Sequence, residues 1–141
     1  MRRHAAPDDP GLRAAAAELH RSSLVVDLHQ DTLLWRRLLG YAPEREHRPL
    51  ASRWLGLAPP LLGQSDLPRL RRGGVAGVGF GVVTNPFWRK AARRAAFRTL
   101  ELLGELAAAS PEQLLLARRA SDLDEAQRSG RVAAFPVLEG A

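Results

Sequence analysis

Two residues at the end of a largely apolar stretch have the types and the spacing of metal ligands. His29 and Asp31 follow residues 24–28, Leu-Val-Val-Asp-Leu. Side chains at positions i and i+2 of a β-strand lie on the same side of it. An imidazole and a carboxylate held side by side supply part of a divalent metal site. A buried histidine that hydrogen-bonds to a neighbouring aspartate explains the same spacing, and the residues alone leave both interpretations open.

A second apolar run ends in a carboxylate. Residues 132–138 are almost entirely apolar, and Glu139 follows them directly. A glutamate in this position is not expected in a core, so it is either exposed to solvent or a ligand at the end of a strand. As a ligand it can bridge two divalent ions through its two oxygens, and two ions that share a hydroxide form a strong nucleophile at neutral pH.

Asp27 and an alternating set of glycines have two interpretations each. Asp27 precedes His29 by two residues and either orients its ring by a hydrogen bond or pairs with an arginine or a backbone N–H. Gly77, Gly79 and Gly81 alternate along one strand, which allows another backbone or a ligand to come close. Simple packing is the favoured interpretation for the glycines.

Strand and helix patterns alternate along the chain, which predicts parallel β/α units. The strands are continuously apolar, as expected when both faces of a sheet are covered. Pro136 fits its strand only where its missing N–H faces no partner. The expected elements are helix 10–21, strand 24–29, helix 31–39, an irregular loop 40–64, a helix from 65–68 to 73–74, strand 75–83, helix 87–108, strand 114–117, a helix that a capping box at 121–124 begins and Gly130 ends, and strand 132–138.

Composition limits the classes of protein. The 141 residues suffice for one domain with a sizeable core. The absence of cysteine excludes disulfides and thiolate metal sites, so any metal must be held by His, Asp and Glu. The net charge is +6, but the arginines are scattered among acids, which favours a solvated surface over nucleic-acid binding.

The other histidines and the tryptophans are expected to be structural. His4, His20 and His47 are expected at the surface, and Trp35, Trp54 and Trp88 in packing, with Trp54 in the irregular loop as the best exception.

No targeting or membrane segment is expected. Asp8, Asp9 and Pro10 stand where a signal peptide would need its apolar region. No stretch approaches the roughly 20 apolar residues that span a bilayer. These features predict a cytoplasmic protein.

Three segments, in order, resemble hallmarks of the membrane (renal) dipeptidase family. Residues 25–33, Val-Val-Asp-Leu-His-Gln-Asp-Thr-Leu, resemble its opening motif, and residues 64–75 are similar to a second hallmark. Residues 130–141 resemble the segment that carries the family's metal-bridging glutamate. Together the three matches cover about residues 23–141, and three ordered motifs are far more specific than a single His-x-Asp.

The resemblance implies a (β/α)8 TIM-type barrel that hydrolyses the amide bond of dipeptides with two zinc ions. It assigns His29 and Asp31 to one ion and makes Glu139 the bridge and the catalytic residue. A D-residue on the C-terminal side of the substrate is often tolerated in the family. The expected partners are a dipeptide and, in the full-length form, a second copy of the chain.

The resemblance also implies that more residues are needed. The family's other metal ligands are two histidines further along the chain, and a full barrel takes about 250 residues. We therefore expect residues 23–141 to form the N-terminal part of the barrel, residues 1–22 an arm with a short helix, and this chain to be an unstable, inactive fragment with an unpaired edge at strand 132–138. The alternatives are another metal-dependent amide or lactam hydrolase on the same barrel, a non-catalytic basic binding protein, and a product without function.

Overall fold

The computed structural model describes residues 9–47, 65–84 and 89–139. Most of the predicted irregular loop, including Trp54, lies outside these residues, as do His4, Trp88 and the first residues of the predicted helix 87–108. Within the described residues no helix is both long and apolar enough to cross a membrane.

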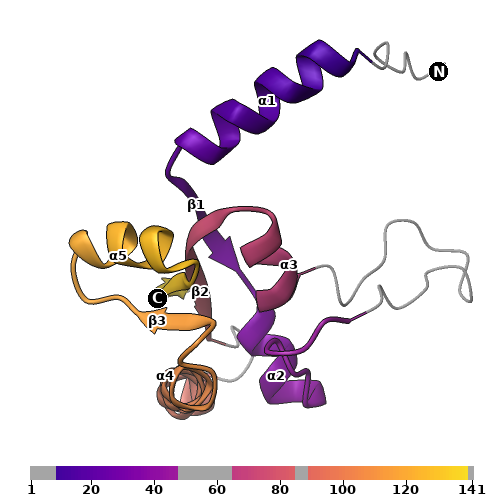
Figure 1. The fold of residues 1–141 in the computed structure, drawn as a ribbon. Helices are drawn as coiled ribbons and strands as arrows, with labels where there is room; N and C mark the ends of the chain where they lie inside the picture. The colour runs from indigo at the N-terminus through magenta and orange to yellow at the C-terminus, as the bar shows by residue number, and fades with distance from the viewer. Residues whose placement is uncertain (1–8, 48–64, 85–88, 140–141) are drawn as a thin grey trace, which may run out of the picture.

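The predicted alternation of strands and helices is confirmed (Figure 1). Every expected element is present, with bounds that differ from the prediction by only one or two residues where the structure describes them. The elements are α1 (Pro10–Ser22), β1 (Val25–Gln30), α2 (Thr32–Leu39), α3 (Leu67–Arg72), β2 (Val75–Val83), α4 (Arg89–Ala109), β3 (Leu114–Leu116), α5 (Ser121–Ser129) and β4 (Val132–Glu139).

The four strands form one parallel sheet in the order β1-β2-β4-β3. β4 pairs with β2 from Ala133 to Glu139, but β3 pairs with β4 only as far as Ala134. The expected open edge of β4 is therefore confined to its second half. Val132 N–H donates to Gln113 O and Ala134 O accepts from Ala117, so by alternation Pro136 faces the side that β3 no longer covers. This position meets the condition set for the proline.

The two faces of the sheet are covered differently. Val78 and Phe80 of β2 pack with Leu103 and Leu106 of α4 in the main buried cluster. The other face of β2 carries Gly77, Gly79 and Gly81, and α5 packs there through Leu123, which a Cβ at Gly77 would meet at 2.5 Å. From β2 to β3 the chain crosses the sheet in one direction, and from β3 to β4 it crosses back in the opposite direction. Because connections between parallel strands are right-handed, α5 must lie on the face of the sheet opposite α4.

The starts of α1 and α3 follow ordinary capping chemistry, whereas the start of α5 does not. The Asp9 carboxylate caps α1, and Asp66 accepts the N–H of Arg69 at the start of α3. The predicted capping box at Ser121 is wrong, because Ala120 is the N-cap and has no side-chain bond. The Asp122 carboxylate instead accepts the backbone N–H groups of Arg118 and Arg119, and these hydrogen bonds lower its pKa.

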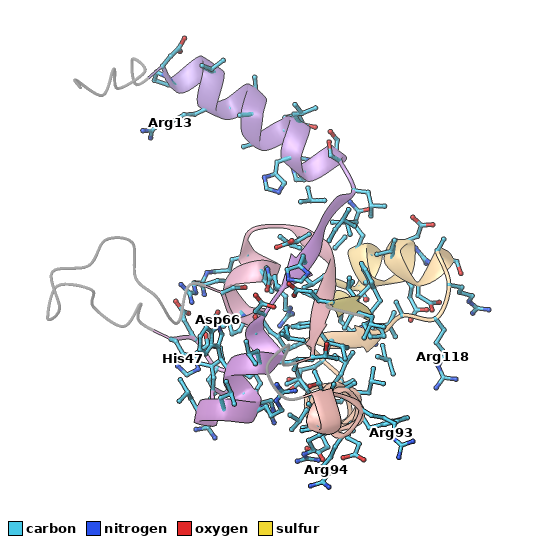
Figure 2. The ribbon with its side chains drawn as sticks, turned by 180° about the vertical axis from the view of Figure 1, so that it is seen from behind. Arg13, His47, Asp66, Arg93, Arg94 and Arg118 are labelled. Carbon is cyan, nitrogen blue, oxygen red and sulfur yellow. The ribbon has the colours of Figure 1, made fainter. Side chains whose placement is uncertain are left out.

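The helix α1 stands apart from the rest. None of its residues is buried, and Figures 1 and 2 show it extending away from the sheet. Arg93 and Arg94 of α4, and Arg118, also point away from the body of the protein in Figure 2, and all three are exposed. Several other arginines pair with acids, as Arg98 does with Glu105 at 2.8 Å.

The carboxyl end of β2 is held from the helix side by one partly buried side chain, that of Arg37. Nη1 of Arg37, on α2, donates to Ala95 O at 3.0 Å and to Thr99 Oγ1 at 2.9 Å, and it reaches Val83 O at 3.4 Å. One guanidinium therefore joins α2, α4 and the last residue of β2. This contact fixes the strand end that carries Gly81.

Candidate metal centre

Asp31 lies at the junction of β1 and α2 with its carboxylate unused by the helix. It occupies the N-cap position of α2, where an aspartate normally accepts a backbone N–H of the first turn. Here the side chain makes no capping hydrogen bond. The Asp31 Oδ1 atom is buried and has no hydrogen-bond partner among the described residues. A buried, unpaired acceptor is costly, so this oxygen is available to a cation.

Glu139 is the last residue of β4, and its backbone is held by the end of β2. It pairs with Val83 of β2, and its carbonyl oxygen accepts the N–H of Thr84 at 3.4 Å and the Thr84 hydroxyl at 3.1 Å. The register places Gly79 opposite Phe135 and Gly81 opposite Val137. Glu139 therefore shares the glycine face, on which Gly81 lies close to His29.

The two predicted strand ends do converge. His29 Nε2 lies 3.3 Å from Asp31 Oδ1 and 3.3 Å from Glu139 Oε2. One ligand atom from each residue falls within 4.8 Å of the others. The three side chains are 44%, 43% and 52% exposed respectively, so a substrate can reach them.

The arrangement fits a divalent metal. Ligand atoms about 2.0–2.2 Å from a tetrahedral zinc ion lie about 3.4 Å from each other, which matches the two distances from His29 Nε2. One imidazole and two carboxylates also form a donor set that suits zinc. The unpaired Asp31 Oδ1 would gain a partner in the ion.

The glycines prove to have separate roles. Gly77 and Gly79 admit close packing, because a Cβ would meet Leu123 at Gly77 and the Leu28 carbonyl at Gly79. At Gly81, however, a Cβ would lie 2.8 Å from Asp31 Oδ1 and 3.3 Å from His29 Cε1. The favoured packing interpretation therefore holds for the first two, whereas Gly81 borders the candidate site. The alternating pattern does not distinguish Gly81 from the other two glycines, although its place near the carboxyl end of the strand is a usable signal.

Replacing Gly81 with alanine is expected to weaken zinc binding by at least about tenfold, because the added methyl group displaces the two candidate ligands His29 and Asp31 from their geometry. Competition with a coloured chelator measures the affinity. Gly104→Ala is the matched control, since nothing lies within 4 Å of a Cβ at that position, and it should leave the affinity unchanged. Equal affinities for the two variants would show that Gly81 does not border the metal site.

Asp27 follows the second of its two predicted interpretations. Its Oδ1 accepts the backbone N–H of His29 at 3.1 Å, and its Oδ2 accepts the Gln30 side-chain amide at 2.7 Å. Asp27 therefore holds the strand end through the backbone, and the described contacts do not join it to the imidazole ring.

The other histidines lie away from the cluster. His20 is exposed on α1, as predicted. The surface prediction for His47 is wrong, because this residue is half-buried. Its ring Nε2 lies 2.7 Å from Ala42 O, and the ring packs on Tyr41 with a centroid distance of 4.3 Å. The partial burial of this histidine among charged neighbours comes from packing that the local sequence does not reveal.

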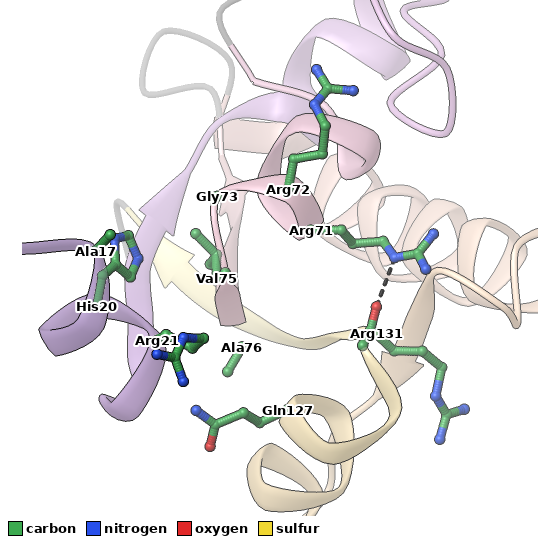
Figure 3. Close-up of a pocket in the computed structure, with 12 residues that line it drawn as sticks. Ala17, His20, Arg21, Arg71, Arg72, Gly73, Val75, Ala76, Gln127 and Arg131 are labelled. Carbon is green, nitrogen blue, oxygen red and sulfur yellow. Dashed lines mark hydrogen bonds between the residues drawn. The ribbon is translucent and has the colours of Figure 1, made fainter. Parts of the chain in front are cut away.

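A cavity of about 500 Å³ lies at the opposite ends of the strands (Figure 3). It is bordered by the end of α1, by the residues that lead into β2, and by Gly130. Arg71 Nε donates to Gly130 O at 2.7 Å. The other arginines that line the cavity pair with glutamates: Arg21 with Glu18, Arg72 with Glu46 and Arg131 with Glu125. The cavity is therefore separate from the candidate metal centre.

Comparison with known proteins identifies the family. The family model described as Membrane dipeptidase (Peptidase family M19) matches residues 13–141. Comparison with curated proteins finds no significant match. The family has a TIM-barrel fold and is generally metal-dependent, and the parallel α/β sheet agrees with part of such a barrel. The chain therefore belongs to the membrane dipeptidase family, whose members are hydrolases of peptide substrates.

Proposed function

We propose that the chain carries part of the active site of a zinc-dependent dipeptidase. The observation that supports this most is the convergence of His29, Asp31 and Glu139 at the carboxyl ends of β1 and β4. Active sites of β/α barrels lie at this end of the strands. The family match supplies the peptidase class, and the donor set supplies the argument for zinc.

Each of the three residues has a distinct role in this proposal. His29 and Asp31 would hold one ion from the β1 side. Glu139 approaches His29 through Oε2, and its second carboxylate oxygen would be available to a further ion. A bound zinc ion supplies Lewis acidity, which polarises the amide carbonyl and lowers the pKa of water. The half-exposed position of all three side chains leaves room for a dipeptide on the glycine face.

The number of ligands bears on activity. The described residues contain one cluster of three metal-ligating side chains, which suffices for one ion with an open position. A second ion needs the further histidines that the family resemblance implies. We propose that the 141-residue chain binds one zinc ion and hydrolyses dipeptides poorly or not at all, with residues 1–22 as an arm outside the barrel. A homodimer of the full-length form and a cytoplasmic location stay predictions.

The test joins this chain to a family segment that carries the two missing histidines. The joined protein is expected to cleave dipeptides, to lose the activity in a chelator and to regain it with zinc. A cyclic amide in the substrate panel distinguishes a lactam hydrolase on the same barrel. Cleavage that a chelator does not affect, or turnover of the cyclic amide alone, would overturn the proposed function.

A further inference from the structure

The strand that carries His29 and Asp31 is irregular just before them. Asp27 pairs with Val78 and Gln30 pairs with Phe80, so three steps along β1 match two along β2. One extra residue is therefore inserted between Asp27 and Gln30. Such a bulge bends a strand and aims a side chain in a new direction.

The bulge leaves backbone groups that need other partners, and the neighbouring residues provide them. The Asp27 carboxylate accepts the N–H of His29 at 3.1 Å. The Leu28 carbonyl presses against β2 where a Cβ at residue 79 would collide with it, so Gly79 makes room for it. Residues of both strands therefore accommodate the bulge: Asp27 on β1 and Gly79 on β2.

Gln30 links this bulge to the segment that begins α3. Its Nε2 donates to Asp27 Oδ2 at 2.7 Å, and its Oε1 accepts the Ser65 hydroxyl at 2.8 Å. The Tyr41 hydroxyl in turn donates to Ser65 O at 2.8 Å. Both ends of the Gln30 amide are therefore occupied, which fixes its orientation between the two candidate ligands.

We infer that Asp27 and Gln30 are positioning residues, which hold the bulge so that His29 and Asp31 point at a common metal ion. This inference rests on the proposed function. The carboxylate of Asp27 is required because it accepts two donors at once, from the His29 backbone and from the Gln30 amide. Partners one step removed from a metal commonly change its affinity by about 10–100-fold.

A charge-preserving exchange tests the inference. Asp27→Asn sets an amide N–H against the Gln30 N–H group, and Gln30→Glu sets a second carboxylate against Asp27. Each single variant is expected to lower zinc affinity by about 10–100-fold. In the double variant the new amide donates to the new carboxylate, which still accepts from Ser65. The double variant should regain an affinity close to that of the unaltered chain.

Two further measurements separate the causes. Asp124→Asn, at an exposed position on α5, makes the same chemical change and should leave the affinity unchanged. Hydrogen exchange of the His29 amide in metal-free protein reports the bulge without any metal. It should quicken in each single variant and return in the double variant.

The outcomes are distinct. Single variants that bind zinc normally, or a double variant as weak as the singles, would overturn the inference. An unaltered chain that binds no zinc would overturn the proposed function instead. If the chain binds no zinc, an unchanged rate of hydrogen exchange at the His29 amide in Asp27→Asn would also overturn the claim that Asp27 holds the bulge. A faster rate in that variant would support the claim.

Discussion

Replacing His29 with alanine is expected to abolish zinc binding by the chain. The Nε2 atom of His29 lies 3.3 Å from a carboxylate oxygen of each of the other two residues. Without His29, only two carboxylates remain at the candidate site, and its one nitrogen ligand is absent. The zinc affinity should fall by more than about 100-fold, since mutation of a residue that only contacts a metal ligand already lowers metal affinity by about 10–100-fold. Asp31→Ala should have a comparable effect.

Thermal unfolding with and without zinc makes the effect visible. A ligand present at about 100 times its Kd stabilises a protein by about 2.7 kcal/mol, which raises the Tm of a chain of this size by roughly 5–10 °C. The unaltered chain should show this rise and lose it in a chelator, and the His29→Ala variant should show none. His20→Ala, on the exposed helix α1, is the control. An unchanged rise in His29→Ala would remove His29 from the site.

Replacing Asp66 with alanine is expected to destabilise the protein by about 3 kcal/mol. Asp66 is 1% exposed. Its carboxylate caps α3 through the Arg69 N–H at 2.9 Å, binds the Arg69 side chain at 2.8 Å, and accepts the His47 N–H at 2.9 Å. Breaking a buried ion pair costs about 3–5 kcal/mol, and the partly exposed guanidinium places the value at the lower end. Figure 2 shows Asp66 and His47 on the same side of the protein.

The same interactions set a pH dependence. Burial raises the pKa of Asp66, but the hydrogen bonds from Arg69 and from the His47 and Arg69 backbones outweigh it, so the pKa is lowered overall. An unfolded aspartate titrates near 3.9. The stabilisation is therefore complete above about pH 4–5 and is lost as the pH falls through the lower folded pKa.

Urea unfolding across pH checks both statements. The difference between the unaltered chain and Asp66→Asn should be constant near neutrality and should shrink below about pH 4. Asp124→Asn should show little difference at any pH. A difference for Asp66→Asn that grows as the pH falls would contradict the assigned interactions.

The candidate site was predictable because simple rules decide its position. The i, i+2 spacing of His29 and Asp31 places both at the carboxyl end of one strand, and Glu139 ends another apolar run. Parallel strands bring their carboxyl ends to one edge, so the three side chains meet there. These rules need no knowledge of distant packing.

The features that were missed depend on contacts between distant segments. The bulge in β1 requires both the Asp27 carboxylate and the space left by Gly79 on another strand. The position of β4 between β2 and β3 depends on a three-residue strand too short to show a pattern. The burial of His47 comes from its contacts with Tyr41 and Asp66. Periodicity along the chain carries no signal for any of these.

Anomalous diffraction from zinc-loaded crystals of the chain tests the central claim most directly. We predict one zinc peak within about 2.0–2.2 Å of His29 Nε2, Asp31 Oδ1 and Glu139 Oε2, and loss of that peak in His29→Ala. A zinc ion bound elsewhere, for example at His20 or His47, with these three side chains free of metal, would contradict the account.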